Sequence, residues 1–584
     1  MILDKINSPQ DVKLLNYKQL TMLASEIRVA LLKNMSEIGG HVGPNLGLIE
    51  ATIALHYVFN SPIDKFIFDV SHQSYTHKIL TGRKDAYINP EKYGTVTGFT
   101  CPEESEHDFF NIGHTSTSIS LATGLAKARD LAGRQENIIA IIGDGSMTGG
   151  MAFEGLNVAS EQATNLIIVV NDNDMSIAES HGGIIKHLAQ LRENNGVIDN
   201  NFFKVLGFDY LFVAEGNEVE PLIKAFESVK DIDKPVVVHI NTKKGKGYKI
   251  AEENKEDWHW YPPFDLETGS KRQRFSSISL DTIVADYLQK KMKADSSIVL
   301  ITPAVPMTVG FTSEIRQSLG KQYVDVGIAE EQAITMAAGI SKNGGKAIVA
   351  THSTFYQRTY DQISHDLCIN KCPVTLLVRN GSVWGANDET HLGFFDVAMM
   401  SNIPNLVYLA PTTCEEYLAM LDWSIEQNEH PVAIRIPKNG IQHASEAVET
   451  DYGHLNTNIV TVKGELVAIF ALGDFYQMGE ELSRAITDNY GFIPTLINPR
   501  YMTGLDYELL KHLENNHKVV ITLEDGILDG GYGQKIASYY GNTELRILNY
   551  GLAKEFVNGF KASNLLFNNG IEINSIVKEI KRYI

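Results

Sequence analysis

The chain has little of what secreted, membrane-spanning or nucleic-acid-binding proteins need. Its four cysteines among 584 residues have no paired C-x2-C spacing and are too few for a disulfide framework. No apolar run reaches the roughly 18 to 20 residues of a membrane span, and the start MILDKINSPQ lacks the features of a signal peptide. A formal net charge of −20 disfavours binding to nucleic acid or to an anionic membrane. These absences predict a cytoplasmic protein with neither nucleic-acid nor membrane partners.

The order of strand-like and helical runs predicts an α/β fold in three units. Residues 20–59 have a helical pattern that a glycine-rich turn at 39–45 interrupts, and α/β order continues to Thr242. The aromatic and charged residues 252–274 break this order, and we interpret them as an interdomain crossing. A second unit has strand candidates at 297–302, 346–350 and 374–378, and a third has them at 466–471 and 518–523.

Two polar turns follow apolar, β-branched runs at 138–142 and 166–170, which are typical of buried parallel strands. The first turn is Gly143-Asp144-Gly145, and the second contains Asn171, Asp172 and Asn173. Magnesium prefers hard oxygen ligands and commonly shares them with phosphate. Asp144, the Asn173 side chain and the Met175 carbonyl therefore form a candidate Mg²⁺ site, and this pair of turns is typical of proteins that bind thiamine diphosphate. Two ordinary βα turns are the alternative interpretation.

Several motifs along nearly the whole chain resemble those of the 1-deoxy-D-xylulose-5-phosphate synthase family, within the transketolase superfamily. They are GGHVGPNLG (39–47), FDVSHQSYTHKILTGR (68–83), IGHTSTSIS (112–120), GDGSMTGGMAFEGLN (143–157), TKKGKGY (242–248), DVGIAE (325–330), STFYQRTYDQISHD (353–366) and THLGFFD (390–396).

The resemblance implies a transketolase-like fold of three α/β domains, usually within a homodimer. We expect a diphosphate- and magnesium-binding domain at 1–270, a pyrimidine-binding domain at 278–440 and a C-terminal domain at 455–584. It also implies an enzyme that condenses pyruvate with D-glyceraldehyde 3-phosphate, releases carbon dioxide and forms 1-deoxy-D-xylulose 5-phosphate, a precursor of isoprenoids and thiamine. The implied cofactors are thiamine diphosphate and Mg²⁺.

The resemblance also assigns roles to residues. Glu330 would hydrogen-bond a pyrimidine nitrogen of the cofactor and favour its reactive tautomer. His41, His72 and His391 would act near substrate and cofactor, and Arg358 and Lys438 would bind the acceptor phosphate. The remaining expected cofactor contacts are Gly113, His114, Thr115, Gly145, Ser146, Tyr248 and Phe355.

The chain departs from the family pattern mainly on the acceptor side. His352, Asn380 and Asn387 stand where the family has tyrosine, arginine and aspartate, Gln332 replaces a histidine, and Lys438 replaces an arginine. Arg379, beside Asn380, is a candidate to restore the lost charge. The segment 181–207 is shorter than in typical members. Two alternatives therefore stay open: a paralogous thiamine diphosphate enzyme with another aldehyde acceptor or ketol donor, and a noncatalytic relative, which the retained Asp144, Asn173 and Glu330 disfavour.

Overall fold

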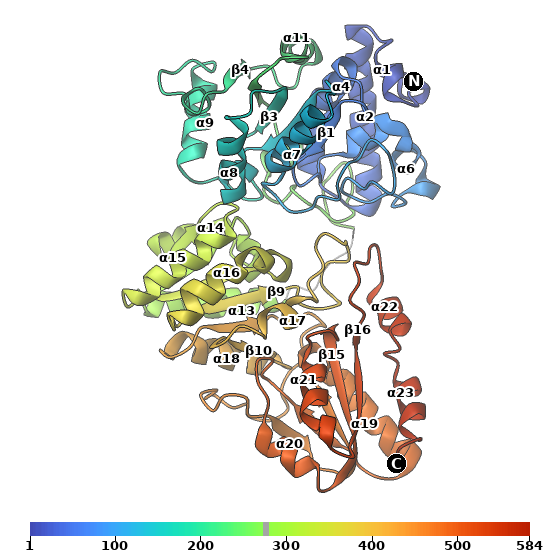
Figure 1. The fold of residues 1–584 in the computed structure, drawn as a ribbon, viewed down its shortest axis with the longest axis vertical. Coiled ribbons are helices and arrows are strands. Elements are labelled where there is room, and N and C mark those ends of the chain that lie inside the picture. The colour runs from blue at the N-terminus through green and yellow to red at the C-terminus, as the bar shows by residue number, and fades with distance from the viewer. Residues whose placement is uncertain (273–278) are drawn as a thin grey trace. The chain divides into compact units, whose positions relative to one another are not determined.

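The computed structural model describes residues 1–272 and 279–584, which divide into two compact units (Figure 1). Unit 1 comprises residues 1–276 with 327–329, and unit 2 comprises residues 277–326 with 330–584. Among the described residues, no helix is both long and apolar enough to cross a membrane.

Unit 1 contains one parallel sheet of five strands in the order β1-β2-β3-β5-β4. The strands are β1 (Lys65–Phe68), β2 (Ile138–Gly143), β3 (Leu166–Asp172), β4 (Asp209–Val213) and β5 (Pro235–Asn241). The longer helices around them are α2 (Tyr17–Ile38), α3 (Val42–Gly47), α4 (Ile49–Val58), α7 (Ser118–Leu131), α8 (Gly150–Ala159), α9 (Gly183–Glu193) and α11 (Val219–Val229). The expected α/β class is confirmed.

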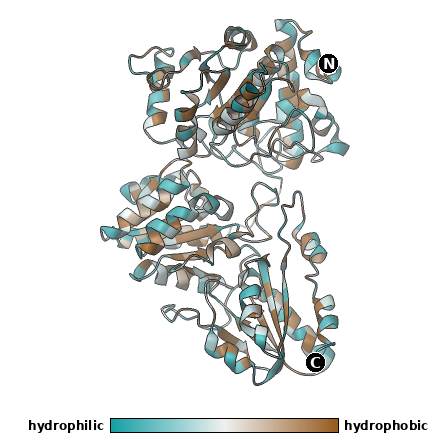
Figure 2. Cartoon of the chain, in the orientation of Figure 1, coloured by the Kyte–Doolittle hydropathy of each residue, from teal (hydrophilic) through white to brown (hydrophobic). Residues whose placement is uncertain are grey.

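Both faces of this sheet are buried, as the unbroken apolar runs of β2 and β3 predicted. Ile139 and Ile141 of β2 pack into one core with α4 and α11, whereas Ile138 and Ile142 pack into another with α7, α8 and α9. Side chains alternate along a strand, so a strand covered by helices on both sides needs apolar residues at every position. Figure 2 shows the corresponding mixture of teal and brown residues on the helices.

The glycine-rich turn is shorter than the sequence predicted, because α3 already begins at Val42. Helix α2 ends at Ile38, and the next residue, Gly39, has a φ of +80°. A Cβ on Gly39 would lie 2.9 Å from the Tyr261 carbonyl oxygen, so only glycine permits this close approach.

The interpretation of residues 252–274 as an interdomain crossing was wrong for their described part. Trp258 and Phe264 are buried in the unit 1 core, and Tyr261 stacks on Trp258 with ring centroids 4.0 Å apart. The Gly43 N–H donates to the Trp258 carbonyl at 2.8 Å. Burial of these aromatic side chains stabilises unit 1, and the same residues in an exposed interdomain segment would lose that stabilisation. Residues 273 and 274 lie outside the described part of the chain.

Unit 2 contains two sheets. The first has six parallel strands in the order β10-β11-β9-β8-β6-β7. Its strands are β6 (Ile298–Thr302), β7 (Tyr323–Asp325), β8 (Lys346–His352), β9 (Thr375–Arg379), β10 (Val407–Leu409) and β11 (Val432–Arg435), with helices that include α13 (Leu280–Ala294), α15 (Glu330–Lys342), α17 (Asp396–Met400) and α18 (Cys414–Glu426).

The second sheet has the order β12-β14-β13-β15-β16, and its edge strand β12 is antiparallel to β14. Its strands are β12 (Ile459–Val462), β13 (Leu466–Ala471), β14 (Thr495–Asn498), β15 (His517–Ile527) and β16 (Arg546–Leu552), and its helices include α19 (Tyr476–Tyr490), α21 (Tyr532–Tyr539) and α23 (Ile573–Ile580). The five strand runs that the sequence predicted for unit 2 correspond to β6, β8, β9, β13 and β15.

Candidate active site

The acidic turn and the asparagine turn meet at the carboxyl edge of the unit 1 sheet. Strands β2 and β3 are parallel, and their register pairs Gly143 with Asn171. The Met175 N–H, from the second turn, donates to Asp144 Oδ2 at 3.0 Å. The structure therefore brings together the two turns predicted to hold one ligand, at the edge where open α/β sheets bind them.

Of the three polar side chains in the second turn, Asn173 keeps an unused oxygen. Thr242 Oγ1 donates to Asn171 Oδ1 at 2.5 Å. Asp172 is paired with Arg192 at 2.5 Å and with His239 at 2.8 Å. Asn173 Oδ1 is buried and has no hydrogen-bond partner among the described residues. A buried acceptor without a donor is costly, so this oxygen is suited to bind a cation or a water from outside the chain.

Close packing of the two turns depends on Gly145. An added Cβ would lie 2.6 Å from Ser176 Cβ and 2.9 Å from Ser176 Cα. Real Cβ atoms do not approach other carbons so closely, so any side chain at 145 would force the turns apart.

Two buried titratable side chains, one acidic and one basic, lie at this edge. Burial, followed by the neighbouring Asp172 carboxylate, raises the pKa of Asp144 to about 8. Burial lowers the pKa of Lys244 to about 7, although Asp144 opposes that shift. Lys244 Nζ donates to the Ser176 carbonyl at 2.5 Å. A cation bound beside Asp144 would favour its ionised form.

The donor set suits a magnesium ion that shares its coordination with phosphate. Among residues 1–272 and 279–584, no group of three or more His, Cys, Asp or Glu side chains could hold a metal by itself. Asp144 and the unpartnered Asn173 oxygen are hard donors, and Mg²⁺ usually takes only one or two carboxylates and fills its shell with phosphate and water. The residues present therefore fit this ion and a diphosphate better than they fit a metal site built from protein alone.

Three histidines cluster in unit 1, two of them predicted. The rings of His41 and His72 are 5.0 Å apart, and His259 lies 5.8 Å from His41 and 5.1 Å from His72. Asn45 Nδ2 donates to the carbonyls of both His41 and His72 at 2.8 Å, which fixes the two backbones together. Burial lowers the pKa of His259 well below 6.5, with smaller effects of Lys244 and the two other histidines.

The other predicted cofactor contacts in unit 1 come from two further segments. Gly113, His114 and Thr115 precede Ser116, whose hydroxyl donates to the Ser146 carbonyl at 2.8 Å. Tyr248 is buried, and its hydroxyl donates to the Leu266 carbonyl at 3.1 Å.

In unit 2, Glu330 begins helix α15 and is 2% exposed. Burial raises its pKa, and the charge of Arg358 opposes this shift. Arg358 Nη1 lies 3.4 Å from Glu330 Oε2. The side chain predicted to bind the acceptor phosphate thus contacts the predicted catalytic carboxylate, and its role as a phosphate ligand stays a prediction.

The rings of His352, Phe355 and His391 contact one another in sequence near the end of β8. Phe355 stacks with His352 at 5.5 Å between centroids and meets the edge of His391 at 5.8 Å. Burial lowers the pKa of His352 to about 3, with a further contribution from Arg379, so this imidazole is neutral at physiological pH. A hydrogen bond of 2.8 Å joins His391 Nδ1 and the Thr390 hydroxyl.

Arg379 is already paired, so it does not replace the positive charge that the family's arginine would supply at position 380. Its guanidinium is paired with the Asp281 carboxylate and donates to the Thr308 carbonyl at 2.9 Å. Asn380 has a φ of +59°, its Nδ2 lies 3.3 Å from His352 Nδ1, and its buried Oδ1 has no partner among the described residues.

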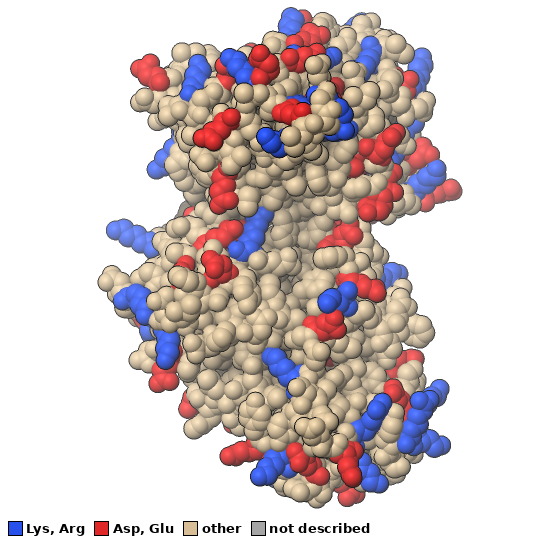
Figure 3. All heavy atoms as spheres, in the orientation of Figure 1, with Lys and Arg blue, Asp and Glu red and all other residues tan. Residues whose placement is uncertain are grey.

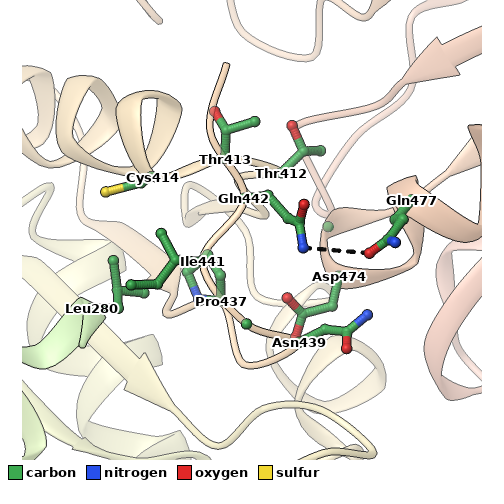
Figure 4. A pocket seen from close by; sticks show the side chains of 12 residues that line it. Leu280, Thr412, Thr413, Cys414, Pro437, Asn439, Ile441, Gln442, Asp474 and Gln477 are labelled. Carbon is green, nitrogen blue, oxygen red and sulfur yellow. Dashed lines mark hydrogen bonds between the residues drawn. The ribbon is translucent and has the colours of Figure 1, made fainter. Parts of the chain in front are cut away.

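Lys438 lies on the loop after β11, and Asp474 holds this loop in place. Both Asp474 carboxylate oxygens accept from the Lys438 backbone N–H, at 3.0 and 3.1 Å. Figure 4 shows Asp474 and Asn439 lining a pocket in which Gln442 donates to Gln477 at 3.4 Å. Burial lowers the pKa of Lys438, and the charge of Arg379 adds to this effect.

Sequence reasoning missed Lys244 and His259. Lys244 lies within the quoted TKKGKGY motif, and the glycines of that motif were the available signal of a close approach. His259 lies between two tryptophans in the segment taken for a crossing. Nothing in its spacing indicated the contact with His41 and His72.

Comparisons with known proteins agree over the length of the chain. A family model described as 1-deoxy-D-xylulose-5-phosphate synthase matches residues 3–199 and 194–242, and one for the pyrimidine-binding domain of transketolase matches residues 276–442. A 1-deoxy-D-xylulose-5-phosphate synthase of Halothermothrix orenii is 37% identical over 100% of this chain and 97% of its own length. One of Listeria monocytogenes is 38% identical over 99% of this chain and 97% of its own.

Proposed function

This chain belongs to the 1-deoxy-D-xylulose-5-phosphate synthase family, and we propose that it condenses pyruvate with D-glyceraldehyde 3-phosphate to 1-deoxy-D-xylulose 5-phosphate and carbon dioxide. It is a thiamine diphosphate-dependent transferase with a transketolase-like α/β fold. The cofactor, when bound, supplies the carbon nucleophile that the decarboxylation of pyruvate requires.

The observation that carries the proposal is the buried Asn173 oxygen without a partner among the described residues, on the same turn whose Met175 N–H donates to the buried Asp144 carboxylate. We propose that these oxygens and the Met175 carbonyl bind Mg²⁺, and that the ion and the nearby Gly145 and Ser146 hold the diphosphate. His72, Gly113, His114, Thr115 and Tyr248 complete the proposed contacts with the cofactor. The fit of hard donors to Mg²⁺ supports this assignment.

In unit 2, Glu330 is the proposed partner of the cofactor pyrimidine. Burial raises its pKa, so it is suited to share or donate a proton in a hydrogen bond to a ring nitrogen. Phe355 would pack against the pyrimidine. Arg358 and Lys438 would bind the acceptor phosphate.

Three histidines are proposed to handle protons and substrate hydroxyls: His41, His72 and His391. Imidazoles exchange protons near neutral pH, which suits a reaction that protonates and deprotonates oxygen atoms.

Residues 1–270, 278–440 and 455–584 are the proposed diphosphate-binding, pyrimidine-binding and C-terminal domains, and each range contains one of the three sheets. A homodimer is proposed as well. Helix α8 exposes Met151, Phe153 and Val158, at 41%, 38% and 51%, which suits an interface between protein surfaces. A cytoplasmic location is proposed because the four cysteines are free and buried.

The test is carbon dioxide release from pyruvate by the purified chain with thiamine diphosphate and Mg²⁺, with and without D-glyceraldehyde 3-phosphate. We expect release that the aldehyde stimulates and a product with the mass of a deoxyxylulose phosphate. No release under any of these conditions would contradict the proposed reaction.

A second candidate function differs only in the acceptor aldehyde. The pairing of Arg379 with Asp281 and the neutral Asn380 favour it, because both reduce the positive charge available for a phosphate. Release from pyruvate without stimulation by D-glyceraldehyde 3-phosphate, but with stimulation by an unphosphorylated hydroxyaldehyde, would identify this case.

A further inference from the structure

Asp69 follows strand β1 and connects the loops that carry several proposed cofactor contacts. Its side chain is 1% exposed. Its Oδ1 accepts from the Ser116 N–H at 2.8 Å, and its Oδ2 accepts from the Ser118 N–H at 3.0 Å. The carboxylate therefore fixes the loop that begins with Gly113, His114 and Thr115.

The backbone of Asp69 fixes the loop that carries His72. Its carbonyl accepts from the Ser71 N–H at 2.5 Å and from Gln73 Nε2 at 3.0 Å. Between Asp69 and His72, Val70 and Ser71 both have positive φ, +58° and +68°. A β-branched residue is strained in this region, and such strain persists only where the surroundings enforce it.

Ser116 extends the connection to a third loop. It also has a positive φ, +72°, and its hydroxyl donates to the Ser146 carbonyl at 2.8 Å. A Cβ on Gly149 would lie 2.2 Å from Ser116 Oγ, so the turn after β2 packs tightly against this serine. Asp69 thus connects three segments: its backbone carbonyl holds the His72 loop, its carboxylate holds the loop of His114, and Ser116 links that loop to Ser146.

We propose that Asp69 is a positioning residue of the thiamine diphosphate site, which sets the relative placement of the His72 loop and the 113–118 loop. This inference rests on the proposed function of those loops. The simpler role is a cap for α7, since Ser118 begins that helix and Thr117 makes no side-chain cap. A cap alone would affect stability and leave cofactor affinity unchanged.

Asp69→Asn tests the proposal, because it keeps the shape of the side chain and places an amide nitrogen against a backbone donor. The matched control is Asp64→Asn. Asp64 is 3% exposed, stands before β1 at the opposite edge of the sheet, and accepts from the backbone N–H groups of Asn137 at 2.7 Å and Asn60 at 2.6 Å.

Binding of thiamine diphosphate with Mg²⁺ would be measured by calorimetry, alongside thermal melting and kcat at saturating cofactor. We expect both variants to melt at a lower temperature, but only Asp69→Asn to weaken cofactor binding, by about tenfold or more. At saturating cofactor, its kcat should fall by a smaller factor than its affinity for the cofactor does.

Unchanged affinity in Asp69→Asn, or an equal loss in Asp64→Asn, would overturn the proposal and leave Asp69 as a cap. If Asp69→Asn does not fold, Asp69→Ser decides, since its shorter side chain cannot reach both the Ser116 and the Ser118 N–H groups and adds no amide nitrogen against them. Weakened binding in that variant supports the proposal, and wild-type binding overturns it. Failure of the unchanged chain to bind thiamine diphosphate would overturn both the proposed cofactor site and this inference.

Discussion

Gly145→Ala should separate the two turns of the proposed cofactor site. The new Cβ would start 2.6 Å from Ser176 Cβ, whereas carbon atoms pack at about 3.5 to 4.0 Å. The turns must therefore move apart by about 1 Å. Asp144 lies on one turn and Asn173 on the other, so the displacement changes the spacing of the two proposed metal oxygens.

A misplacement of this size costs about a hundredfold in a process that depends on the geometry. We therefore expect the dissociation constant for thiamine diphosphate with Mg²⁺ to rise by about that factor, which corresponds to about 2.7 kcal/mol. The strain falls on an edge of the sheet, so the core on either face should remain intact. Circular dichroism and thermal melting would establish that the variant is folded.

Calorimetric titration of the variant with cofactor and metal measures the effect. Gly150→Ala, five residues further along, is the control, because a Cβ there would meet no atom within 4 Å. It should bind as the unchanged chain does. Wild-type affinity in Gly145→Ala would refute the assignment of the two turns to one ligand.

Three further predictions concern other parts of the molecule. Glu330→Gln should bind thiamine diphosphate with Mg²⁺ normally but lower kcat by about a hundredfold or more; normal turnover would contradict its proposed role. Lys438→Ala should raise KM for D-glyceraldehyde 3-phosphate about tenfold or more, and Lys438→Arg should restore it. Since burial lowers the pKa of Lys438, the wild-type KM should rise with pH as this cation deprotonates, and Lys438→Arg should not show that rise; a pH-independent KM in both would exclude the contact. Trp258→Ala should destabilise unit 1 by about 3 to 5 kcal/mol, measured by urea unfolding, because a stacked, buried ring is lost; a smaller loss than an exposed Trp260→Ala control would contradict its place in the core.

The sequence predicted the parts of the site that follow from periodicity and chain order. Buried strands are recognisable by their unbroken apolar runs, so the turns of Asp144 and Asn173 could be placed at one sheet edge. It could not predict the contact of His259 with His41 and His72. That contact forms because the aromatic segment around His259 folds back onto residues near the start of the chain. Nor could the sequence reveal Asp69, whose importance comes from the partners of its carboxylate and from the strained backbone at Val70 and Ser71.

The acceptor side shows why a charge count cannot substitute for geometry. By sequence, Arg379 compensates for the asparagine at 380, but in the structure the guanidinium already has the Asp281 carboxylate as its partner. His352 contributes no charge at neutral pH, because burial and the charge of Arg379 hold its pKa near 3. Lys438 is an ammonium with a lowered pKa and no fork geometry for a phosphate. A phosphorylated acceptor near Lys438 would therefore favour the protonated amine. At alkaline pH its binding would then be accompanied by proton uptake. The arginine typical of the family stays protonated, so it would not produce this linkage.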